Sequence, residues 1–256
     1  MAQYQHVIAG SGLIGGFLGG IIGQSAQVRF IGRPTWIGRL AEGITLTDYA
    51  GIKAEYKASA EECLEALPAK IERSIIWLTV KNTALAELLK GLQPVVAADC
   101  ILVCCQNGLG AAALTQKYFP GTRVLQGIVG CNVMWDEGLK QLQKTTEGEF
   151  YLERPKNLAP EITEALSMVQ HELLSLCWRK EIEAVAWAKL QLNLANSINA
   201  IVNQPVRAML LDRGCRQVIA ALMDELLAVT AARNIRLPRL SRVPARYLPA
   251  VLRLPD

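Results

Sequence analysis

Short apolar runs separated by segments of helical length dominate the first 160 residues of the chain. The runs cover residues 4–9, 27–31, 74–80, 100–105 and 123–134. Helical patterns lie between them, at residues 13–24, 60–67, 83–92 and 110–118. This alternation is typical of βαβ units, in which a mostly parallel sheet is covered by helices on both faces. Shorter alternating stretches at 44–57 and 148–153 allow additional strands.

The pattern changes after about residue 160, where strand-like runs cease. Helical patterns follow at residues 160–177, 181–203 and 212–232. We therefore predict an α/β domain followed by a second domain that is all-helical. The expected boundary lies at residues 178–182, directly before the longest helical pattern.

A glycine-rich turn joins the first apolar run to the first helical pattern. Its residues are Gly10, Ser11, Gly12, Leu13, Ile14 and Gly15. In a G-x-G-x-x-G turn, the first glycine permits a tight bend, the second lets the backbone approach a pyrophosphate, and the third lets the helix pack on the strand. Free N–H groups at the start of the helix would face the phosphates. The turn predicts a dinucleotide site, with a plain glycine-rich turn before a small-residue helix as the alternative.

The residues after the second apolar run indicate which dinucleotide is preferred. A site selective for NAD usually has Asp or Glu here to hold the ribose 2′-hydroxyl. This chain has Gly32, Arg33 and Pro34 instead. A guanidinium forms charge-assisted, bidentate hydrogen bonds with a 2′-phosphate. The sequence therefore favours NADP(H), with Arg33 as the residue that contacts the 2′-phosphate. Arg39 is a rival for this role, and the alternative is that Arg33 is an ordinary solvated arginine.

Polar residues also follow two further predicted strands. Lys81 ends the run at 74–80, and Gln106, Asn107 and Gly108 follow the run at 100–105. Ligands of open α/β sheets bind outside the carboxyl ends of the strands. Lys81 and Asn107 are therefore expected on the same rim as the glycine-rich turn.

The helical pattern at 181–203 carries a stripe of polar residues. Lys189, Asn193 and Asn196 stand at i, i+4 and i+7, and Asn203 follows seven residues later, so all four are expected on one face. Asparagine is a poor helix former, and a merely solvated face would carry Glu, Lys and Arg. The stripe predicts a polar cleft, and a buried structural ladder of asparagines is the alternative.

Composition narrows the class of protein. The 256 residues, 51% of them hydrophobic, can bury one large core or two modest ones. No apolar stretch is long enough to span a bilayer and no leader precedes the first strand, so a cytoplasmic protein without membrane contact is expected. Seven scattered cysteines without a C-x-x-C pair indicate reduced thiols, and no metal site is expected.

The net charge of +4 is unevenly distributed along the chain. Residues 233–256 hold six arginines and one acid, a balance of +5, so the preceding 232 residues sum to −1. Prolines interrupt this basic segment, and leucine and valine are interleaved with its arginines. A solvated helical surface is preferred to a site for nucleic acid or an anionic membrane.

These motifs together resemble the ketopantoate reductases (2-dehydropantoate 2-reductases) over nearly the whole chain. GSGLIG and IGRP resemble that family's nucleotide turn and 2′-phosphate arginine, and TVK at 79–81 resembles its strand-ending lysine. CQNG at 105–108 is similar to its asparagine turn. KLQLNLANSINAI at 189–201 is similar to its catalytic helix, although the second asparagine is one residue nearer than in some members. DELLAVTAARNIRLP at 224–238 resembles the helix that follows.

The resemblance implies both a fold and a reaction. The fold would be α/β, with an N-terminal Rossmann-type, mostly parallel sheet that binds NADP over residues 1–180. An all-helical C-terminal domain over residues 181–256 would bind substrate and form a homodimer. Hydride from NADPH would reduce the C2 ketone of 2-dehydropantoate to D-pantoate, in the biosynthesis of pantothenate and coenzyme A.

The resemblance also implies a role for each polar residue of the site. Lys189 would be the general acid, because an ammonium in a cleft can protonate the developing alkoxide and stabilise its charge. Asn107 would bridge the nicotinamide and the substrate, and Asn193 and Asn196 would orient the keto acid. Lys81 would reach the NADP.

One departure from the family's pattern leaves three interpretations open. Members usually continue with Ser-Ser-Met and G-R-x-T-E-I-D segments, whose serine and glutamate contact the substrate, whereas this sequence ends at Asp256. The helical domain is therefore expected to be truncated. The chain can be a working reductase, a catalytically impaired NADP-binding relic or partner protein, or a reductase of another small 2-keto acid.

Overall fold

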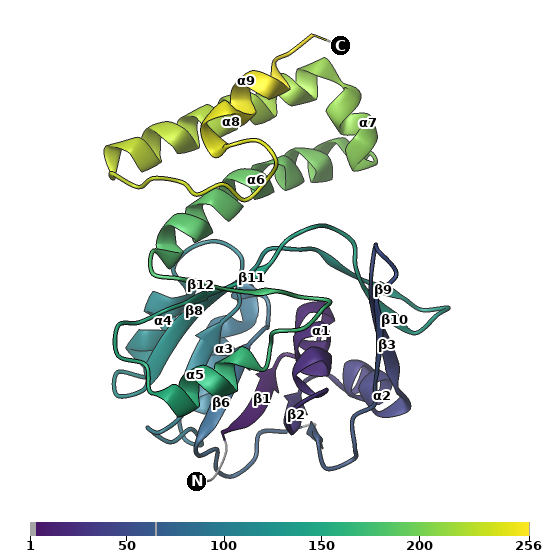
Figure 1. Cartoon of the computed structure of the whole chain (residues 1–256), viewed down its shortest axis with the longest axis vertical. Coiled ribbons are helices and arrows are strands. Elements are labelled where there is room, and N and C mark those ends of the chain that lie inside the picture. Colours follow the sequence, from purple (N-terminus) through teal and green to yellow (C-terminus); the bar gives the residue numbers. More distant parts are fainter. Residues whose placement is uncertain (1–3, 65, 256) are drawn as a thin grey trace. The chain divides into compact units, whose positions relative to one another are not determined.

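The computed structural model describes residues 4–64 and 66–255 (Figure 1). The chain divides into two compact units. The first comprises Met1–Gln106 and Gly110–Lys180, and the second comprises Asn107–Leu109 and Glu181–Asp256. The first unit is α/β with a mostly parallel sheet and the second is helical, which confirms the predicted fold class.

An eight-stranded sheet forms the centre of the first unit, in the order β12-β11-β8-β7-β6-β1-β2-β5. Its strands are β1 (Gln5–Ala9), β2 (Val28–Ile31), β5 (Cys63–Leu64), β6 (Ser74–Leu78), β7 (Ile101–Cys104), β8 (Arg123–Val129), β11 (Phe150–Glu153) and β12 (Leu176–Arg179). Only β8 and β11 pair antiparallel; the other neighbours are parallel. Parallel pairing requires crossover connections, which the helices between the strands provide.

The helices of this unit are α1 (Leu13–Ile22), α2 (Pro34–Glu42), α3 (Asn82–Leu92), α4 (Ala111–Tyr118) and α5 (Pro160–Ser167). Alternate residues of each strand enter different cores because side chains on a strand alternate between its two faces. Trp77 of β6 packs in the core shared with α1 and α5, whereas its neighbour Ile76 packs in the core shared with α3 and α4. Both faces of the sheet are therefore buried, as its near-continuous apolar strands require.

A second sheet of four strands packs against α1, in the order β4-β3-β10-β9. Its strands are β3 (Ile44–Asp48), β4 (Lys53–Tyr56), β9 (Val133–Asp136) and β10 (Gln141–Lys144). Glycines of α1 make the close packing possible: a Cβ on Gly16 would lie 2.9 Å from Leu142 Cδ1, and one on Gly20 would lie 2.9 Å from Leu46 Cδ1. The run of glycines after the nucleotide turn thus has a packing role of its own.

Three sequence-based expectations about secondary structure were wrong. Of residues 60–67, those that the structure describes form no helix; Cys63–Leu64 form β5, which pairs with β2. The helix predicted at 160–177 ends at Ser167, and β12 follows, so strands do not cease after residue 160. The run at 123–134 is divided into β8 and β9 at Gly130, where a Cβ would lie 2.5 Å from the Glu149 carbonyl oxygen. In each case contacts with distant residues override the local pattern.

The second unit consists of α6 (Ile182–Val202), α7 (Val206–Leu211), α8 (Arg213–Ala232), a 3₁₀ turn at Ala245–Tyr247 and α9 (Leu248–Leu252). Its core contains Met209, Ile219 and Met223. Asp212 caps α8, because its carboxylate accepts the Cys215 N–H at 2.7 Å. No helix within the described residues has the length and apolar character needed to cross a membrane.

Candidate nucleotide-binding and active site

The glycine-rich turn has the geometry that its sequence predicts. Gly10 has φ +116°, a conformation that L side chains rarely adopt, and a Cβ there would lie 2.6 Å from the Val80 nitrogen. A Cβ on Gly15 would lie 2.1 Å from the Gly10 carbonyl oxygen. Both contacts are with backbone atoms, which cannot move aside easily. These two positions therefore require glycine for the turn to form.

Gly12 differs from Gly10 and Gly15 because, apart from its own backbone and its two chain neighbours, no heavy atom of the described residues lies within 4 Å of the position of its missing Cβ. It is the N-cap of α1, and no side chain caps this helix. The first N–H groups of an α-helix have no partner within the helix, and the dipole places positive charge at this end. Gly12 therefore offers open space, and the N–H groups of Leu13 and Ile14 offer hydrogen-bond donors to an anion at the same point; the Gly12 N–H itself donates to the Gly10 carbonyl oxygen at 2.8 Å.

Ser11 connects the turn to the end of β2. The N–H groups of Gly10 and Ser11 both donate to the Ile31 carbonyl oxygen, at 2.8 and 3.3 Å. The Ser11 side chain is buried, and its Oγ has no hydrogen-bond partner among the described residues. A Cβ on Gly32 would lie 1.7 Å from that Oγ, so only glycine fits between Ser11 and Arg33. These contacts hold the glycine-rich turn close to Gly32, the residue directly before Arg33.

The two candidate arginines after β2 have different surroundings. Arg33 is the exposed N-cap of α2, and its carbonyl oxygen accepts the N–H groups of Trp36 and Ile37 at 3.0 and 3.1 Å. Arg39 instead lies against two indoles, 4.8 Å from the ring centroid of Trp36 and 4.7 Å from that of Trp135. It also pairs with Glu137. Arg39 is therefore committed to a structural contact, which leaves Arg33 as the better candidate for a 2′-phosphate.

Hydrogen bonds join the carboxyl ends of β1, β6 and β7. Thr79 Oγ1 donates to the Gly10 carbonyl oxygen at 2.8 Å, and Gln106 Nε2 donates to the carbonyl oxygens of Leu78 and Val80 at 2.8 and 3.1 Å. The role of Thr79 was not predicted, because a threonine at a strand end has no distinctive sequence signal. Lys81 follows as the exposed N-cap of α3. Hydrogen bonds thus connect the strand ends that form this rim, and Lys81 is an exposed residue of the rim.

Asn107 follows Gln106 directly and is exposed. Its loop contains Gly108 and Gly110, with φ +87° and +91°, so the backbone turns sharply on both sides of Leu109. In the division of the chain, Asn107 groups with the second unit. Asn107, at the end of β7, is thus grouped apart from the strand that it follows.

The polar stripe of α6 is present in part. Lys189 and Asn193 are half-buried and Asn196 is exposed, and the helix is continuous between them, so the three share one face. Asn203 was placed wrongly on that face, because α6 ends at Val202. Asn203 is the C-cap with φ +48°, a conformation that asparagine tolerates better than most residues.

The buried titratable groups of the sheet are poor catalysts. Burial lowers the pKa of His6 to about 4, and its Nδ1 accepts the Trp77 indole N–H at 3.1 Å, so it is neutral at pH 7. Burial raises the pKa of the Cys104 thiol to about 11 and that of Cys105 well above its usual range. His171 lies in a turn with Leu174 and not in the predicted helix. Among residues 4–64 and 66–255, no cluster of His, Cys, Asp and Glu is placed to hold a metal ion.

Family models match both units of the chain. The model for ketopantoate reductase PanE/ApbA matches residues 6–157, and the model for its C-terminal part matches residues 181–253. The chain belongs to the ketopantoate reductase family. The 2-dehydropantoate 2-reductase of Vibrio cholerae is 24% identical over 169 residues, which are 66% of this chain and 57% of that relative. The enzyme of the same name from Nostoc is 22% identical over 251 residues, covering 93% of this chain and 76% of the relative.

Several solved structures share this fold. The 2-dehydropantoate 2-reductase of Geobacter metallireducens has a TM-score of 0.77 at 18% identity, covering 97% of this chain and 81% of its own. A D-mandelate dehydrogenase solved with NADH and anilino(oxo)acetate has a TM-score of 0.70 at 18% identity, with 97% and 78% covered. A dimeric ketopantoate reductase from Staphylococcus aureus has a TM-score of 0.69 at 19% identity, with 97% and 78% covered.

Proposed function

We propose that this chain is an NADPH-dependent reductase that converts 2-dehydropantoate to D-pantoate. This proposal rests mainly on the glycine-rich turn. The turn has open space at Gly12 and is hydrogen-bonded to the end of β2, close to the exposed Arg33. Membership of the ketopantoate reductase family supports the choice of reaction. NADPH, when bound, would supply the hydride that reduces the C2 ketone.

The residues of the first unit would bind and orient the cofactor. The pyrophosphate would lie at the open N-terminus of α1, against the turn formed by Gly10, Ser11, Gly12, Leu13, Ile14 and Gly15. Arg33 would pair with the 2′-phosphate, because its guanidinium is exposed and its rival Arg39 is engaged elsewhere. Lys81 would add a second positive charge from the end of β6. These contacts favour NADPH over NADH, since NADH lacks the 2′-phosphate.

The residues of α6 and Asn107 would act on the keto acid. Lys189 would donate the proton that the carbonyl oxygen gains, and its charge would stabilise negative charge on that oxygen beforehand. Asn193 and Asn196 lie one and two turns further along the same face, so they would fix the orientation of the substrate. Asn107 would bridge the nicotinamide and the substrate and so keep the two aligned. We therefore expect four residues to affect turnover more than nucleotide affinity: Lys189, Asn107, Asn193 and Asn196.

The proposal extends to the organisation of the protein. Residues 1–180 would form the NADP-binding domain, and residues 181–256 would bind the substrate and a second copy of the chain. A homodimer is supported by the dimeric ketopantoate reductase that shares this fold. Exposed apolar side chains on the helical unit, such as Leu211, Val218 and Leu254, are suited to such an interface. We place the protein in the cytoplasm, where the pyridine nucleotide pool is found.

A reductase of another small 2-keto acid is the second candidate. The D-mandelate dehydrogenase with this fold was solved with NADH and an oxo acid, so the scaffold accepts other acids and the other nicotinamide cofactor. Steady-state turnover of 2-dehydropantoate, phenylglyoxylate and 2-oxoisovalerate, each with NADPH and NADH, decides between the candidates. Fastest turnover of 2-dehydropantoate with NADPH supports the first. Binding of NADPH without turnover of any keto acid would identify a nucleotide-binding protein that has lost catalysis.

A further inference from the structure

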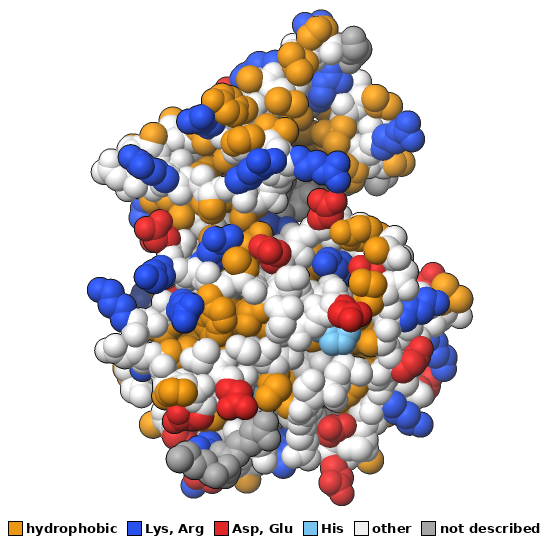
Figure 2. All heavy atoms as spheres, viewed as in Figure 1, with side chains coloured by type: hydrophobic (Ala, Val, Ile, Leu, Met, Phe, Trp, Pro, Cys, Tyr) orange, Lys and Arg blue, Asp and Glu red, His pale blue; other side chains and the backbone are white. Residues whose placement is uncertain are grey.

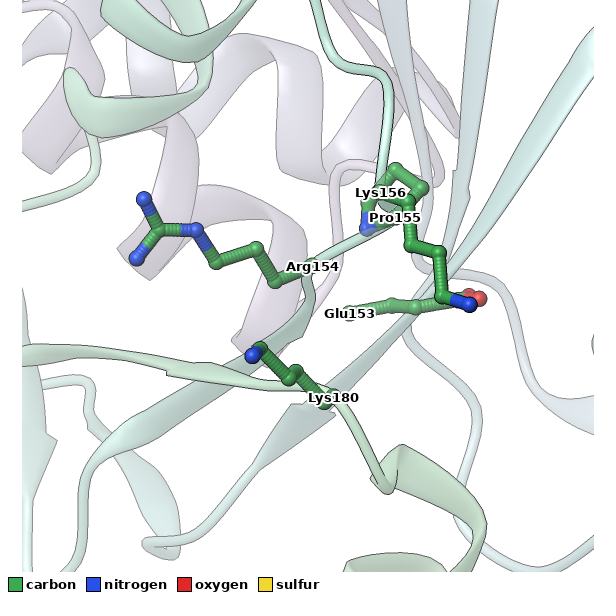
Figure 3. A pocket seen from close by; sticks show the side chains of 5 residues that line it. All are labelled: Glu153, Arg154, Pro155, Lys156 and Lys180. Carbon is green, nitrogen blue, oxygen red and sulfur yellow. The ribbon is translucent and has the colours of Figure 1, made fainter.

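The outer edge of the large sheet carries a pocket of about 650 Å³ whose lining includes none of the residues proposed for the reductase site. Its lining residues are Glu153, Arg154, Pro155, Lys156 and Lys180 (Figure 3). Three cations and one carboxylate give this lining a charge of +2. The volume is in the range of small-molecule sites. Arg154, Lys156 and Lys180 are exposed and, within the described part of the chain, form no ion pair with an acid.

The pocket is distinct from the nucleotide turn. It lies at the ends of β11 and β12, and β8, β7 and β6 stand between β11 and β1 in the sheet. Neighbouring strands are about 4.8 Å apart, so four spacings, roughly 19 Å along the sheet, separate the two sites. An anion bound at this edge could not be the phosphate of a dinucleotide held at Gly12.

The backbone around the pocket is held in place on both sides. The Arg154 N–H donates to the Arg179 carbonyl oxygen at 2.8 Å, which keeps the residue after β11 beside the end of β12. Pro155 fixes its own φ, and Arg123 Nη1 donates to the Asn157 carbonyl oxygen at 3.0 Å. The cations therefore project from a braced segment and not from a loose loop, which reduces the entropic cost of binding a ligand.

The pocket has two chemically different sides. In Figure 3 the side chains of Arg154 and Lys180 extend toward one side, and those of Lys156 and Glu153 extend toward the other. Glu153 is fixed there, because its carboxylate accepts the Gln126 N–H at 2.9 Å. The first side suits a phosphate, since a guanidinium can bind two phosphate oxygens and an ammonium adds a point charge. The second side offers both a donor and an acceptor, which suits the hydroxyl groups of an organic phosphate.

We propose that this pocket, named here the edge pocket, is a binding site for a small organic phosphate, separate from the reductase site. Arg154 and Lys180 would hold the phosphate, and Lys156 and Glu153 would contact its polar organic part. Lys180 directly precedes Glu181, where the second unit and its helix α6 begin. A ligand here would restrain the segment that leads into the helix of Lys189, so the site is suited to regulation.

Calorimetric titration with inorganic pyrophosphate, ADP and glucose 6-phosphate tests the proposal, at low ionic strength and both with and without saturating NADPH. With NADPH saturating, so that the glycine-rich turn and Arg33 are occupied, we expect one saturable site per chain for at least one probe. The double variant Arg154→Ala/Lys180→Ala should weaken binding at least tenfold. The matched control Lys90→Ala/Lys117→Ala removes two exposed cations of α3 and α4 and should leave binding unchanged.

Three results would overturn the proposal. They are absence of saturable binding at millimolar concentrations of every probe, equal weakening in the control variant, and loss of binding when NADPH saturates the protein. The last result would assign the anion to the Arg33 site. Failure of NADPH itself to bind counts against the reductase proposal alone, because the titration without NADPH still tests the edge pocket.

Discussion

The guanidinium of Arg39 lies over the ring of Trp135, 4.7 Å from its centroid, and joins helix α2 to the hairpin of β9 and β10. Trp36 lies on α2 one turn before Arg39, and its ring meets that of Trp135 edge-on at 5.6 Å. Glu137 accepts from both Arg39 and the Trp135 indole N–H. The contact braces the helix whose first turn begins at Arg33, so the two arginines of this region have separable roles.

Replacement of the two arginines should separate cofactor choice from stability. Arg33→Ala should weaken NADPH binding by about tenfold to a hundredfold and leave NADH binding nearly unchanged, because a charge-assisted hydrogen bond contributes roughly 1.5–3 kcal/mol. Arg39→Ala should keep the ratio of the two affinities and lower the unfolding free energy by about 1–2 kcal/mol, since two cation–π contacts are lost. Fluorescence titration and urea denaturation measure these effects. Equal affinities of the unmodified protein for NADPH and NADH would contradict the role of Arg33.

Three glycine substitutions in the nucleotide turn should have different consequences. Gly12→Ala should lower stability by no more than about 1 kcal/mol, because its Cβ enters open space and only the N-cap preference for glycine over alanine is lost. It should nevertheless weaken NADPH binding at least tenfold, because the methyl group occupies the place of the pyrophosphate. Gly10→Ala and Gly15→Ala should instead destabilise the fold, since their Cβ atoms meet backbone. Thermal unfolding and NADPH titration distinguish the two classes, and normal NADPH binding by Gly12→Ala would exclude this turn as the phosphate site.

Removal of the Lys189 amine should affect turnover far more than nucleotide binding. Lys189→Ala should lower kcat for 2-dehydropantoate by about a hundredfold or more, the usual contribution of a general acid, and leave the Kd for NADPH almost unchanged. Glu183→Ala is a suitable control, because Glu183 is exposed on the same helix and away from the stripe. If Lys189→Ala retains near-normal turnover, the stripe on α6 is structural.

The buried pair His6 and Trp77 should make stability depend on pH. Burial lowers the pKa of His6 from 6.5 to about 4, so below pH 6.5 the unfolded chain binds a proton that the folded protein does not. Stability from this group is therefore complete above pH 6.5 and is lost as the pH falls, by up to about 3 kcal/mol near pH 4. Urea denaturation between pH 7.5 and 4.5 should show a smaller loss for His6→Asn than for the unmodified protein. Identical pH profiles would show that His6 is protonated without penalty.

The regular elements near the nucleotide turn could be predicted from the sequence because their signals are local. β1, β2, β6 and β7 are short apolar runs between helical patterns, and buried parallel strands are apolar at nearly every position. The positive φ of Gly10 and the close approach at Gly15 follow from a motif whose six residues are consecutive. The positions of Arg33, Lys81 and Asn107 at strand ends follow from the same pattern.

Figure 2 illustrates why the distribution of charged residues does not by itself reveal a binding site. Lysines and arginines are spread over the visible faces of both units, among acidic and apolar side chains, so basic residues as such do not mark a site. Arg33, Arg39 and Arg154 differ in the indole rings, carboxylates and bonded segments around them, and these come from distant parts of the chain. No spacing in the sequence distinguishes the three.

The sequence by itself determined the alternation of strands and helices, the conformation of the nucleotide turn and the common face of Lys189, Asn193 and Asn196. Each depends on backbone geometry within one element or one turn. Only the tertiary structure decided that Cys63–Leu64 form β5, that β12 follows α5, and that Arg39 contacts Trp135. Which segment forms an edge strand, and which side chains pair, depends on residues that only folding brings together. Short segments with weak local preferences adopt the conformation that those contacts stabilise.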